Sequence, residues 1–199
     1  FLMKKNKIKI FEGFGKLSTD KTINVTDQNG SEIKIIGEKI IIATGARSKE
    51  LPSLKKDGKK IIGYREAMTL EKQPNDIVIV GSGAIGIEFA YFYNSMGTSV
   101  TIVEYLDRIV PVEDSEISKE LEKSLKKKGI NILTSTEVEK AEINSSGSVD
   151  VTLKNSNGEK SIISTEIVLS AVGIKTNIEN IGLEDLGIKT EKDKILVDD

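Results

Sequence analysis

The chain has 199 residues, with 29 basic and 31 acidic side chains, a formal net charge of −2, and neither cysteine nor histidine. This length suggests one domain or parts of two. The two missing residue types exclude a disulfide, a thiolate nucleophile, a Ser-His-Asp triad and the usual zinc ligands. The even balance of charge indicates no nucleic-acid partner, and the longest apolar runs, four or five residues, indicate no membrane span. A redox centre would have to come from outside these side chains.

The amino-terminal part of the chain is predicted to be β structure. Residues 27–30, Asp-Gln-Asn-Gly, are typical of a hairpin turn. Residues 46–75 contain two prolines and one short helical stretch at 65–71, which indicates a connection between two units. Alternating or continuous apolar residues predict strands at 7–10, 22–25, 33–36 and, buried on both faces, at 40–42.

From residue 76 the pattern changes to strands that alternate with amphipathic helices. One helix begins after the glycine-rich stretch and ends at Gly97, and a second runs from 115 to 128 with Asp114 as its N-cap. The three strands of this region are predicted at 77–80, 100–103 and 130–133. Helical spacing predicts that the buried faces carry Ile85, Phe89, Phe92 and Met96 in the first helix and Ile117, Leu121 and Leu125 in the second.

The remaining residues predict antiparallel strands separated by Ser-Ser-Gly and Asn-Gly turns, and then one more buried strand at 167–172. The three strands before it lie at 138–143, 149–153 and 160–163. The sequence therefore predicts an α/β fold, a Rossmann-like doubly wound parallel sheet with an antiparallel three-stranded β-meander. We expect the boundaries to divide the chain into 1–73, 74–174 and 175–199.

Residues 81–86, Gly-Ser-Gly-Ala-Ile-Gly, lie between an apolar strand and an amphipathic helix. In a dinucleotide site of this pattern, Gly81 permits a tight turn, Gly83 lets the backbone approach a diphosphate, and Gly86 lets the helix pack closely on the strand. The diphosphate is then held at the helix N-terminus. The alternative is a glycine-rich turn with no ligand.

Glu104 ends the second strand, 18 residues after Gly86. A carboxylate at this place accepts hydrogen bonds from the adenosine ribose hydroxyls and repels a 2′-phosphate, which favours NAD over NADP. Arg108 complicates this interpretation, because an arginine could accommodate that phosphate. Glu88, in the first helical turn, is either a helix-start acid or a functional residue.

Three segments carry a family resemblance: 79–88, 103–111 and 171–173. They resemble the flavin-dependent pyridine nucleotide–disulfide oxidoreductases. Residues 106–111 with 113–117, and also 182–184 and 195–199, resemble the members that oxidise dihydrolipoamide with NAD⁺. The resemblance extends over the whole chain. It implies that 74–174 is an NAD-binding domain and that 1–73 and 175–199 are incomplete β segments of an FAD-binding domain.

The resemblance also implies cofactor contacts. Glu88 would lie near the nicotinamide, Val138 near the adenine and Gly173 near the nicotinamide end, although core packing and a strand-end turn are alternatives for the last two. The family usually has arginine where this chain has Ile174. The NAD contacts implied are Gly81, Ser82, Gly83, Ala84, Ile85, Gly86, Ile87, Glu88, Glu104, Val138 and Gly173. The FAD contacts implied are Gly15, Thr44, Gly45 and Ala46.

By resemblance, the parent protein is expected to be a cytoplasmic, homodimeric oxidoreductase. It would oxidise the dihydrolipoamide of 2-oxo acid dehydrogenase complexes or of the glycine cleavage system through a redox disulfide and FAD. The disulfide would precede this chain and a catalytic His-Glu pair would follow it, so we expect these 199 residues alone to be inactive. The alternatives are another flavoprotein disulfide reductase, an NADH peroxidase or transhydrogenase, and a stand-alone NAD-binding module.

Overall fold

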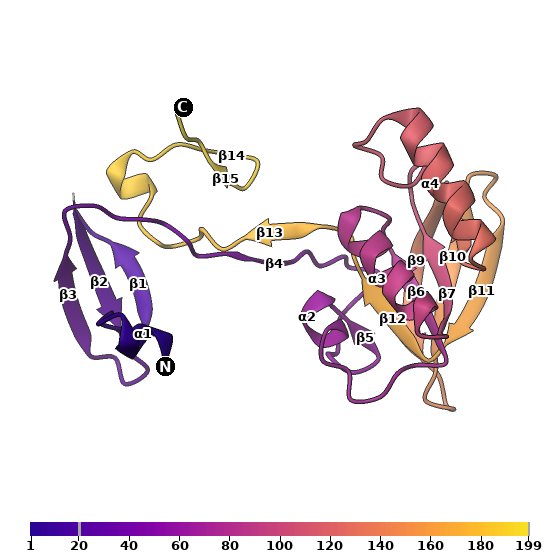
Figure 1. Cartoon of the computed structure of the whole chain (residues 1–199), viewed down its shortest axis with the longest axis horizontal. Coiled ribbons are helices and arrows are strands. Elements are labelled where there is room, and N and C mark those ends of the chain that lie inside the picture. Colours follow the sequence, from indigo (N-terminus) through magenta and orange to yellow (C-terminus); the bar gives the residue numbers. More distant parts are fainter. Residues whose placement is uncertain (20, 199) are drawn as a thin grey trace. The chain divides into compact units, whose positions relative to one another are not determined.

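The computed structural model describes residues 1–19 and 21–198 and divides the chain into two compact units (Figure 1). Unit 1 comprises Phe1–Arg47 and Lys175–Asp199, and unit 2 comprises Ser48–Ile174. The first boundary thus lies nearer the amino terminus than the predicted 73/74, because strand β5 and the buried Leu54 pack with the parallel sheet of unit 2. The assignment of each unit to a cofactor stays a prediction.

A five-stranded parallel sheet forms the centre of unit 2, in the order β5-β12-β6-β7-β8. Strands β6, β7 and β8 follow one another across the sheet in chain order. Strand β12, the last of the sheet in the sequence, lies on the other side of β6. The strand order therefore reverses between β6 and β12. The strands are β5 (Ile61–Ile62), β6 (Asp76–Val80), β7 (Ser99–Val103), β8 (Asn131–Leu133) and β12 (Ile167–Ser170).

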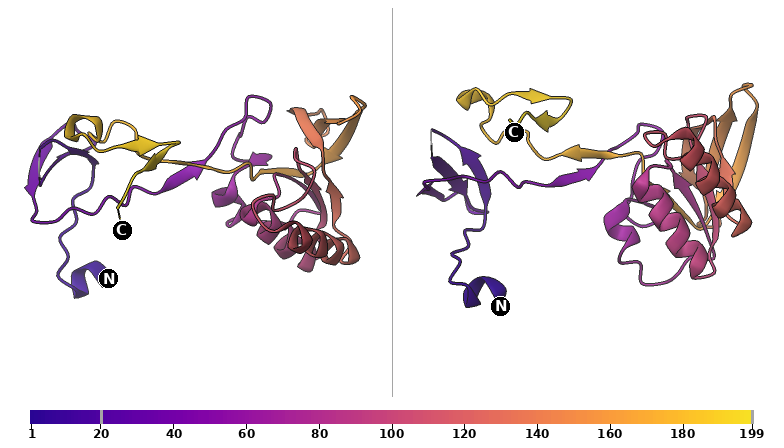
Figure 2. Two further views of the ribbon diagram at one scale, coloured as in Figure 1. Left: turned by 90° about the horizontal axis from the view of Figure 1, so that it is seen from above. Right: turned by 45° about the horizontal axis from the view of Figure 1, so that its top comes forward.

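Three helices cover one face of this sheet: α2 (Tyr64–Ala67), α3 (Ala84–Ser95) and α4 (Ser115–Lys127). Figures 1 and 2 show α3 and α4 beside each other on that face. The shared core contains Ile79 and Ile102 from the strands together with Ala90, Tyr93 and Leu125 from the helices. Alternate strand residues point to the opposite face, as the period of two requires.

The opposite face of the sheet is covered by an antiparallel meander, β9 (Thr136–Ile143), β10 (Val149–Asn155) and β11 (Lys160–Thr165). Val149, Val151 and Leu153 of β10 are almost completely buried. They pack against Val78 of β6 and Val168 of β12. The fold class expected from the sequence is confirmed, with the parallel sheet between a layer of helices and the meander.

Unit 1 contains a three-stranded antiparallel sheet in the order β1-β2-β3. A small apolar cluster joins Leu17 of β1 to Ile181 and Leu183 near the carboxyl end of the chain. Strands β4 (Ala46–Ser48) and β13 (Ile174–Thr176) pair with each other. The other elements are α1 (Leu2–Lys5), β1 (Phe14–Leu17), β2 (Thr22–Thr26), β3 (Glu32–Ile36), a 3₁₀ turn at Glu184–Leu186, β14 (Thr190–Glu191) and β15 (Lys194–Ile195).

Two predicted strands of unit 1 are wrong. Residues 7–10 follow α1 and form no strand. The strand that pairs with β2 is β1, which the alternation of apolar and polar residues did not indicate. Residues 40–42 also form no strand, and Ile41 is 90% exposed. An apolar run becomes a strand only beside a partner, and no described residue pairs with 40–42. The hairpin turn at 27–30 is confirmed, because Asp27 Oδ1 accepts hydrogen bonds from the turn.

The buried face predicted for α3 is confirmed at Ile85 and Phe89, which pack against the core, and is wrong at Phe92 and Met96. The buried residues are Gly86, Ala90 and Tyr93, whereas Phe92 and Met96 are more than half exposed. Gly86 and Ala90 are small and let the helix lie close to the sheet. The Tyr93 hydroxyl donates a hydrogen bond to the Ala67 carbonyl oxygen, so this face is buried in place of the one that carries Phe92 and Met96. In α4, Leu125 is buried as predicted but Ile117 is 63% exposed.

The predicted helix ends are confirmed. Asp114 caps α4 through hydrogen bonds from the N–H groups of Glu116 and Ile117, and Gly97 and Gly129 adopt the left-handed conformation after the two helices. The short helix expected at 65–71 is the single turn α2. Among the described residues, no helix has both the length and the apolar character needed to cross a membrane.

Candidate dinucleotide site

The glycine-rich loop connects β6 to α3 at the carboxyl edge of the parallel sheet. Gly81 has φ +99°, and a Cβ there would lie 2.6 Å from the carbonyl oxygen of Ala171. A Cβ on Gly86 would lie 2.0 Å from the carbonyl oxygen of Gly81. These two positions accept only glycine without a backbone shift. A Cβ on Gly83, in contrast, would meet nothing within 4 Å.

The loop lies where the strand order reverses, since Gly81 follows β6 and its contact Ala171 follows β12. Open α/β sheets bind ligands at such a point, outside the carboxyl ends of the strands. The N-cap of α3 is Gly83, which has no side chain to satisfy the first N–H groups of the helix. The first turn of α3, with open space at Gly83, therefore fits an anion such as a diphosphate.

The side chains of the loop do not line this space. Ser82 is buried, and Ile85 and Ile87 pack against the helical core. Ala84 is exposed. A bound diphosphate would consequently contact these residues through backbone N–H groups.

Glu104, immediately after β7, is 7% exposed, and its carboxylate is held by three protein donors. Oε2 accepts hydrogen bonds from the Ser82 N–H at 2.8 Å and from the Ser82 hydroxyl at 2.6 Å, and Oε1 accepts one from the Leu106 N–H at 2.8 Å. The glycine-rich loop and the acid are thus directly linked. The sequence indicated that both belong to one site but did not indicate this contact.

Arg108 is turned toward its own loop. Its Nη2 donates to the carbonyl oxygen of Pro111 at 3.0 Å, and its Nε is buried without a hydrogen-bond partner among the described residues. The same loop is attached to the glycine-rich segment, because the Val110 N–H donates to the Ser82 carbonyl oxygen at 2.9 Å. This orientation does not direct the guanidinium to Glu104.

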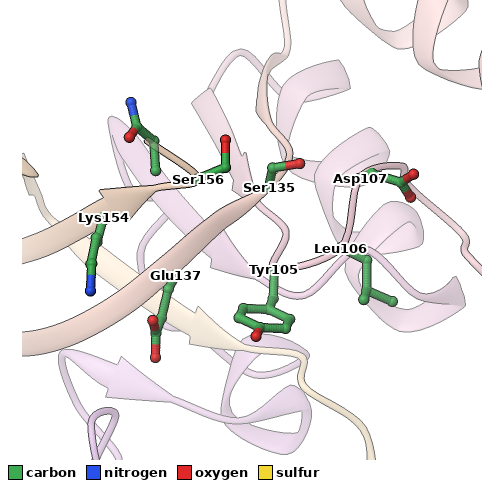
Figure 3. Close-up of a pocket in the computed structure, with 8 residues that line it drawn as sticks. Tyr105, Leu106, Asp107, Ser135, Glu137, Lys154 and Ser156 are labelled. Carbon is green, nitrogen blue, oxygen red and sulfur yellow. The ribbon is translucent and has the colours of Figure 1, made fainter. Parts of the chain in front are cut away.

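A hollow of about 500 Å³ adjoins the end of β7, within the size range of small-molecule sites. Figure 3 shows Tyr105, Glu137 and Lys154 around it, from three different segments. Residues 105–107 follow Glu104, and Ser135 and Glu137 precede Val138. The hollow therefore lies beside both segments that were predicted to contact adenosine. Tyr105 and Asp107 lie in the 103–111 segment that carries the family resemblance, whereas Ser135, Glu137 and Lys154 belong to no motif and were not predicted.

The remaining residues predicted to contact NAD, Val138, Gly173 and Glu88, lie outside the glycine-rich loop and do not line this hollow. The Val138 side chain, in β9 of the meander, is 7% exposed and packs in the core between the meander and the parallel sheet. Gly173, with φ +105°, accepts a hydrogen bond from the Lys49 N–H at 3.0 Å. Glu88 is exposed and lines a hollow together with Met68 and Phe92.

The predicted flavin contacts all belong to unit 1. Asn177 holds two of them, donating through Nδ2 to the Thr44 carbonyl oxygen at 3.1 Å and through its N–H to the Gly45 carbonyl oxygen at 2.9 Å. Gly45 has φ +71°. Gly15 lies in β1, where a Cβ would make an ordinary 3.5 Å contact with Ile23. The 44–46 segment therefore has a constrained backbone, whereas nothing at Gly15 requires glycine. The described residues contain no cluster that could hold a metal ion.

Comparison with known proteins gives consistent matches over the whole chain. Dihydrolipoyl dehydrogenase from Rhizobium etli is 43% identical over 212 aligned residues, which cover 100% of this chain and 44% of the relative. The Bacillus subtilis dihydrolipoyl dehydrogenase is 42% identical, again over 100% of this chain and 44% of the relative. The chain thus spans less than half the length of the curated relatives it matches.

Solved structures show the same likeness. The crystal structure of LpdA from Mycobacterium tuberculosis matches with a TM-score of 0.79 and 28% identity, over 93% of this chain and 40% of that one. A Cu(II) complex of the HOCl-induced flavoprotein disulfide reductase RclA from Escherichia coli matches with a TM-score of 0.81 and 25% identity, over 96% and 42%. The sequence model described as pyridine nucleotide-disulphide oxidoreductase matches residues 1–199. The chain belongs to the pyridine nucleotide–disulphide oxidoreductase family.

Proposed function

We propose that this chain is the NAD-binding portion of a dihydrolipoamide dehydrogenase. The family implies a flavin and a pyridine nucleotide, and the relatives at about 40% identity are named dihydrolipoyl dehydrogenases. In such an enzyme a bound flavin and a bound pyridine nucleotide would supply the hydride-transfer chemistry. The residues of this chain bind and orient the nucleotide.

The observation that supports NAD best is the buried carboxylate of Glu104 beside the glycine-rich loop. Backbone N–H groups at the start of α3 would hold the diphosphate, and Glu104 would hold the adenosine ribose. A 2′-phosphate at that ribose would lie against a negative charge with little water to screen it. Arg108, directed to Pro111, does not offset this repulsion.

The proposal extends to substrate and partners. The substrate would be dihydrolipoamide carried by a 2-oxo acid dehydrogenase complex or by the glycine cleavage system, and the parent protein would be a homodimer. The chain contains no cysteine, so it has no thiol to exchange with a dithiol substrate. We therefore expect residues 1–199 alone not to oxidise dihydrolipoamide with NAD⁺. Turnover by this chain alone would contradict that expectation.

Binding of NADH and NADPH to the natural protein that carries this chain, with its flavin fully reduced beforehand so that no hydride is transferred, tests the nucleotide assignment. We expect NADH to bind at least tenfold more tightly than NADPH. Glu104→Gln removes the charge and is expected to reduce this preference by a factor of ten or more, equivalent to about 1.4 kcal/mol. Glu113→Gln, a charge change at an exposed position, is the matched control and should leave the ratio unchanged. Tighter binding of NADPH by the unaltered protein would refute the proposal.

A second candidate is another flavoprotein disulfide reductase, which the likeness to RclA favours. Substrate assays separate the two. Rapid NAD⁺ reduction with dihydrolipoamide supports the first proposal, and its absence with an intact flavin supports the second.

A further inference from the structure

The hydroxyl of Ser82 makes the shortest of the three hydrogen bonds to the Glu104 carboxylate, at 2.6 Å. Ser82 is 1% exposed, so this hydroxyl has little access to water. Both protein donors on Oε2 come from Ser82, one from its side chain and one from its backbone. Ser82 therefore has a role that the glycines of the loop do not share.

The acceptor capacity of the carboxylate is limited. An ionised carboxylate has about four acceptor positions, two on each oxygen. Both positions on Oε2 receive Ser82 donors, and one on Oε1 receives the Leu106 N–H. A ribose with free 2′- and 3′-hydroxyls brings two donors, but the carboxylate has one position left for them.

We propose that the Ser82 hydroxyl competes with the adenosine ribose for Glu104. It occupies on Oε2 the acceptor position that one ribose hydroxyl would use, and it must turn away when both hydroxyls bind. It also withdraws negative charge from the carboxylate and so weakens the repulsion of a 2′-phosphate. Ser82 thereby limits both the affinity for NAD and the discrimination against NADP. This inference rests on the proposed function.

Removal of the hydroxyl does not release the carboxylate. In Ser82→Ala the Ser82 N–H and the Leu106 N–H still hold one oxygen each. The backbone of Glu104 is fixed independently, because its N–H donates to Leu133 and its carbonyl oxygen accepts from Thr136. The vacated position then accepts a ribose hydroxyl without the cost of breaking an internal hydrogen bond.

The test is the affinity of the natural protein for NADH and NADPH, measured by calorimetry with the flavin fully reduced beforehand so that no hydride is transferred. Ser82→Ala is expected to tighten NADH binding about 3- to 10-fold, without improving NADPH binding, so the ratio of the two affinities rises. In a Glu104→Gln background the same substitution should give no gain. Ser118→Ala is the matched control: this serine is also fully buried, but its hydroxyl donates to the Val110 carbonyl oxygen.

The outcomes are distinguishable. Unchanged or weaker NADH binding by Ser82→Ala overturns the inference, while Glu104-dependent NADH binding by the unaltered protein leaves the proposed function intact. No NADH binding by the unaltered protein refutes both. Ser82→Gly also removes the hydroxyl and provides the same comparison if the alanine variant does not fold. A purely structural role of Ser82 would lower thermal stability without raising the NADH-to-NADPH ratio.

Discussion

Gly86 in the first turn of α3 lies so close to Gly81 that a Cβ on Gly86 would be 2.0 Å from the Gly81 carbonyl oxygen. The same Cβ would lie 3.4 Å from the Cβ of Ala171, at the end of β12. The helix α3, the glycine-rich loop and the residue after β12 therefore pack so closely around Gly86 that only a hydrogen atom fits in place of a side chain. Gly83, three residues earlier, has free space around it.

This difference separates a folding role from a binding role within one loop. Gly86→Ala forces a backbone shift, and we expect the free energy of unfolding to fall by about 1–3 kcal/mol. Gly83 already has φ −67°, which alanine adopts readily, so Gly83→Ala should change stability by less than about 0.5 kcal/mol. Its methyl group would enter the space expected for the diphosphate and should weaken NADH binding at least tenfold. Urea unfolding and calorimetry measure the two effects. Equal stability losses in both variants would contradict the prediction.

Tyr93 joins α3 to α2 and is expected to contribute to stability. Its hydroxyl donates to the Ala67 carbonyl oxygen at 2.6 Å, and the residue is 3% exposed. Tyr93→Phe leaves that carbonyl without its donor, so the free energy of unfolding should fall by about 1–2 kcal/mol. Tyr91→Phe, at a half-exposed position on the same helix, should have no measurable effect.

The same residue gives a pH dependence. Burial raises the pKa of Tyr93 above its usual value of 10.0. The unfolded chain therefore loses this proton at a lower pH than the folded one, and stability falls as the pH rises above about 10. Tyr93→Phe should lose this part of the alkaline sensitivity. An identical alkaline stability profile in the two proteins would show that Tyr93 ionises equally in both states.

Glu179 in unit 1 gives the opposite dependence. The hydrogen bond from Arg47, followed by that from Lys175, lowers the pKa of its carboxyl to about 2. Arg47 Nη2 lies 2.6 Å and Lys175 Nζ 3.0 Å from Glu179 Oε1. Because the folded-state value is below the ordinary 4.5, this group stabilises unit 1 above about pH 4.5, and the contribution is lost as the pH falls through about 2.

Carbon-13 NMR of the carboxyl group measures this titration directly. We expect Arg47→Met to raise the Glu179 pKa more than Lys175→Met does, since Arg47 supplies the larger effect. Titration of the unaltered protein near 4.5 would show that the ion pairs do not persist in solution.

The features that depend on local backbone chemistry could be predicted from the sequence. The loop glycines, the cap at Asp114 and the glycines that end α3 and α4 follow from conformational requirements of single residues. The alternating residues of β10 also predicted its strand, because Val149, Val151 and Leu153 on one face are buried and the residues between them are not.

The features that depend on tertiary partners could not be predicted. The apolar character of residues 40–42 is compatible with a strand, but pairing needs a neighbour. In α3 the sequence favoured Phe92, whereas the closeness of the sheet selected Ala90 and Tyr93. The Ser82–Glu104 hydrogen bond joins residues 22 positions apart, and only the fold brings them together.

The position of β12 affects how the chain must fold. This strand lies between β5 and β6. The N–H of Glu166, the residue before β12, donates a hydrogen bond to Oδ1 of Asp76, the first residue of β6 and 90 positions earlier in the sequence. A nascent chain that ends before β12 exposes the edges of both neighbouring strands, which are apolar and open to pairing with other chains. Pairing of β12 with β6 closes a loop of about 90 residues, and closing so long a loop slows the step that completes the sheet. The sheet that carries the candidate nucleotide site is therefore completed only after the meander has been synthesised, and until then one edge of β6 is open to pairing with other chains.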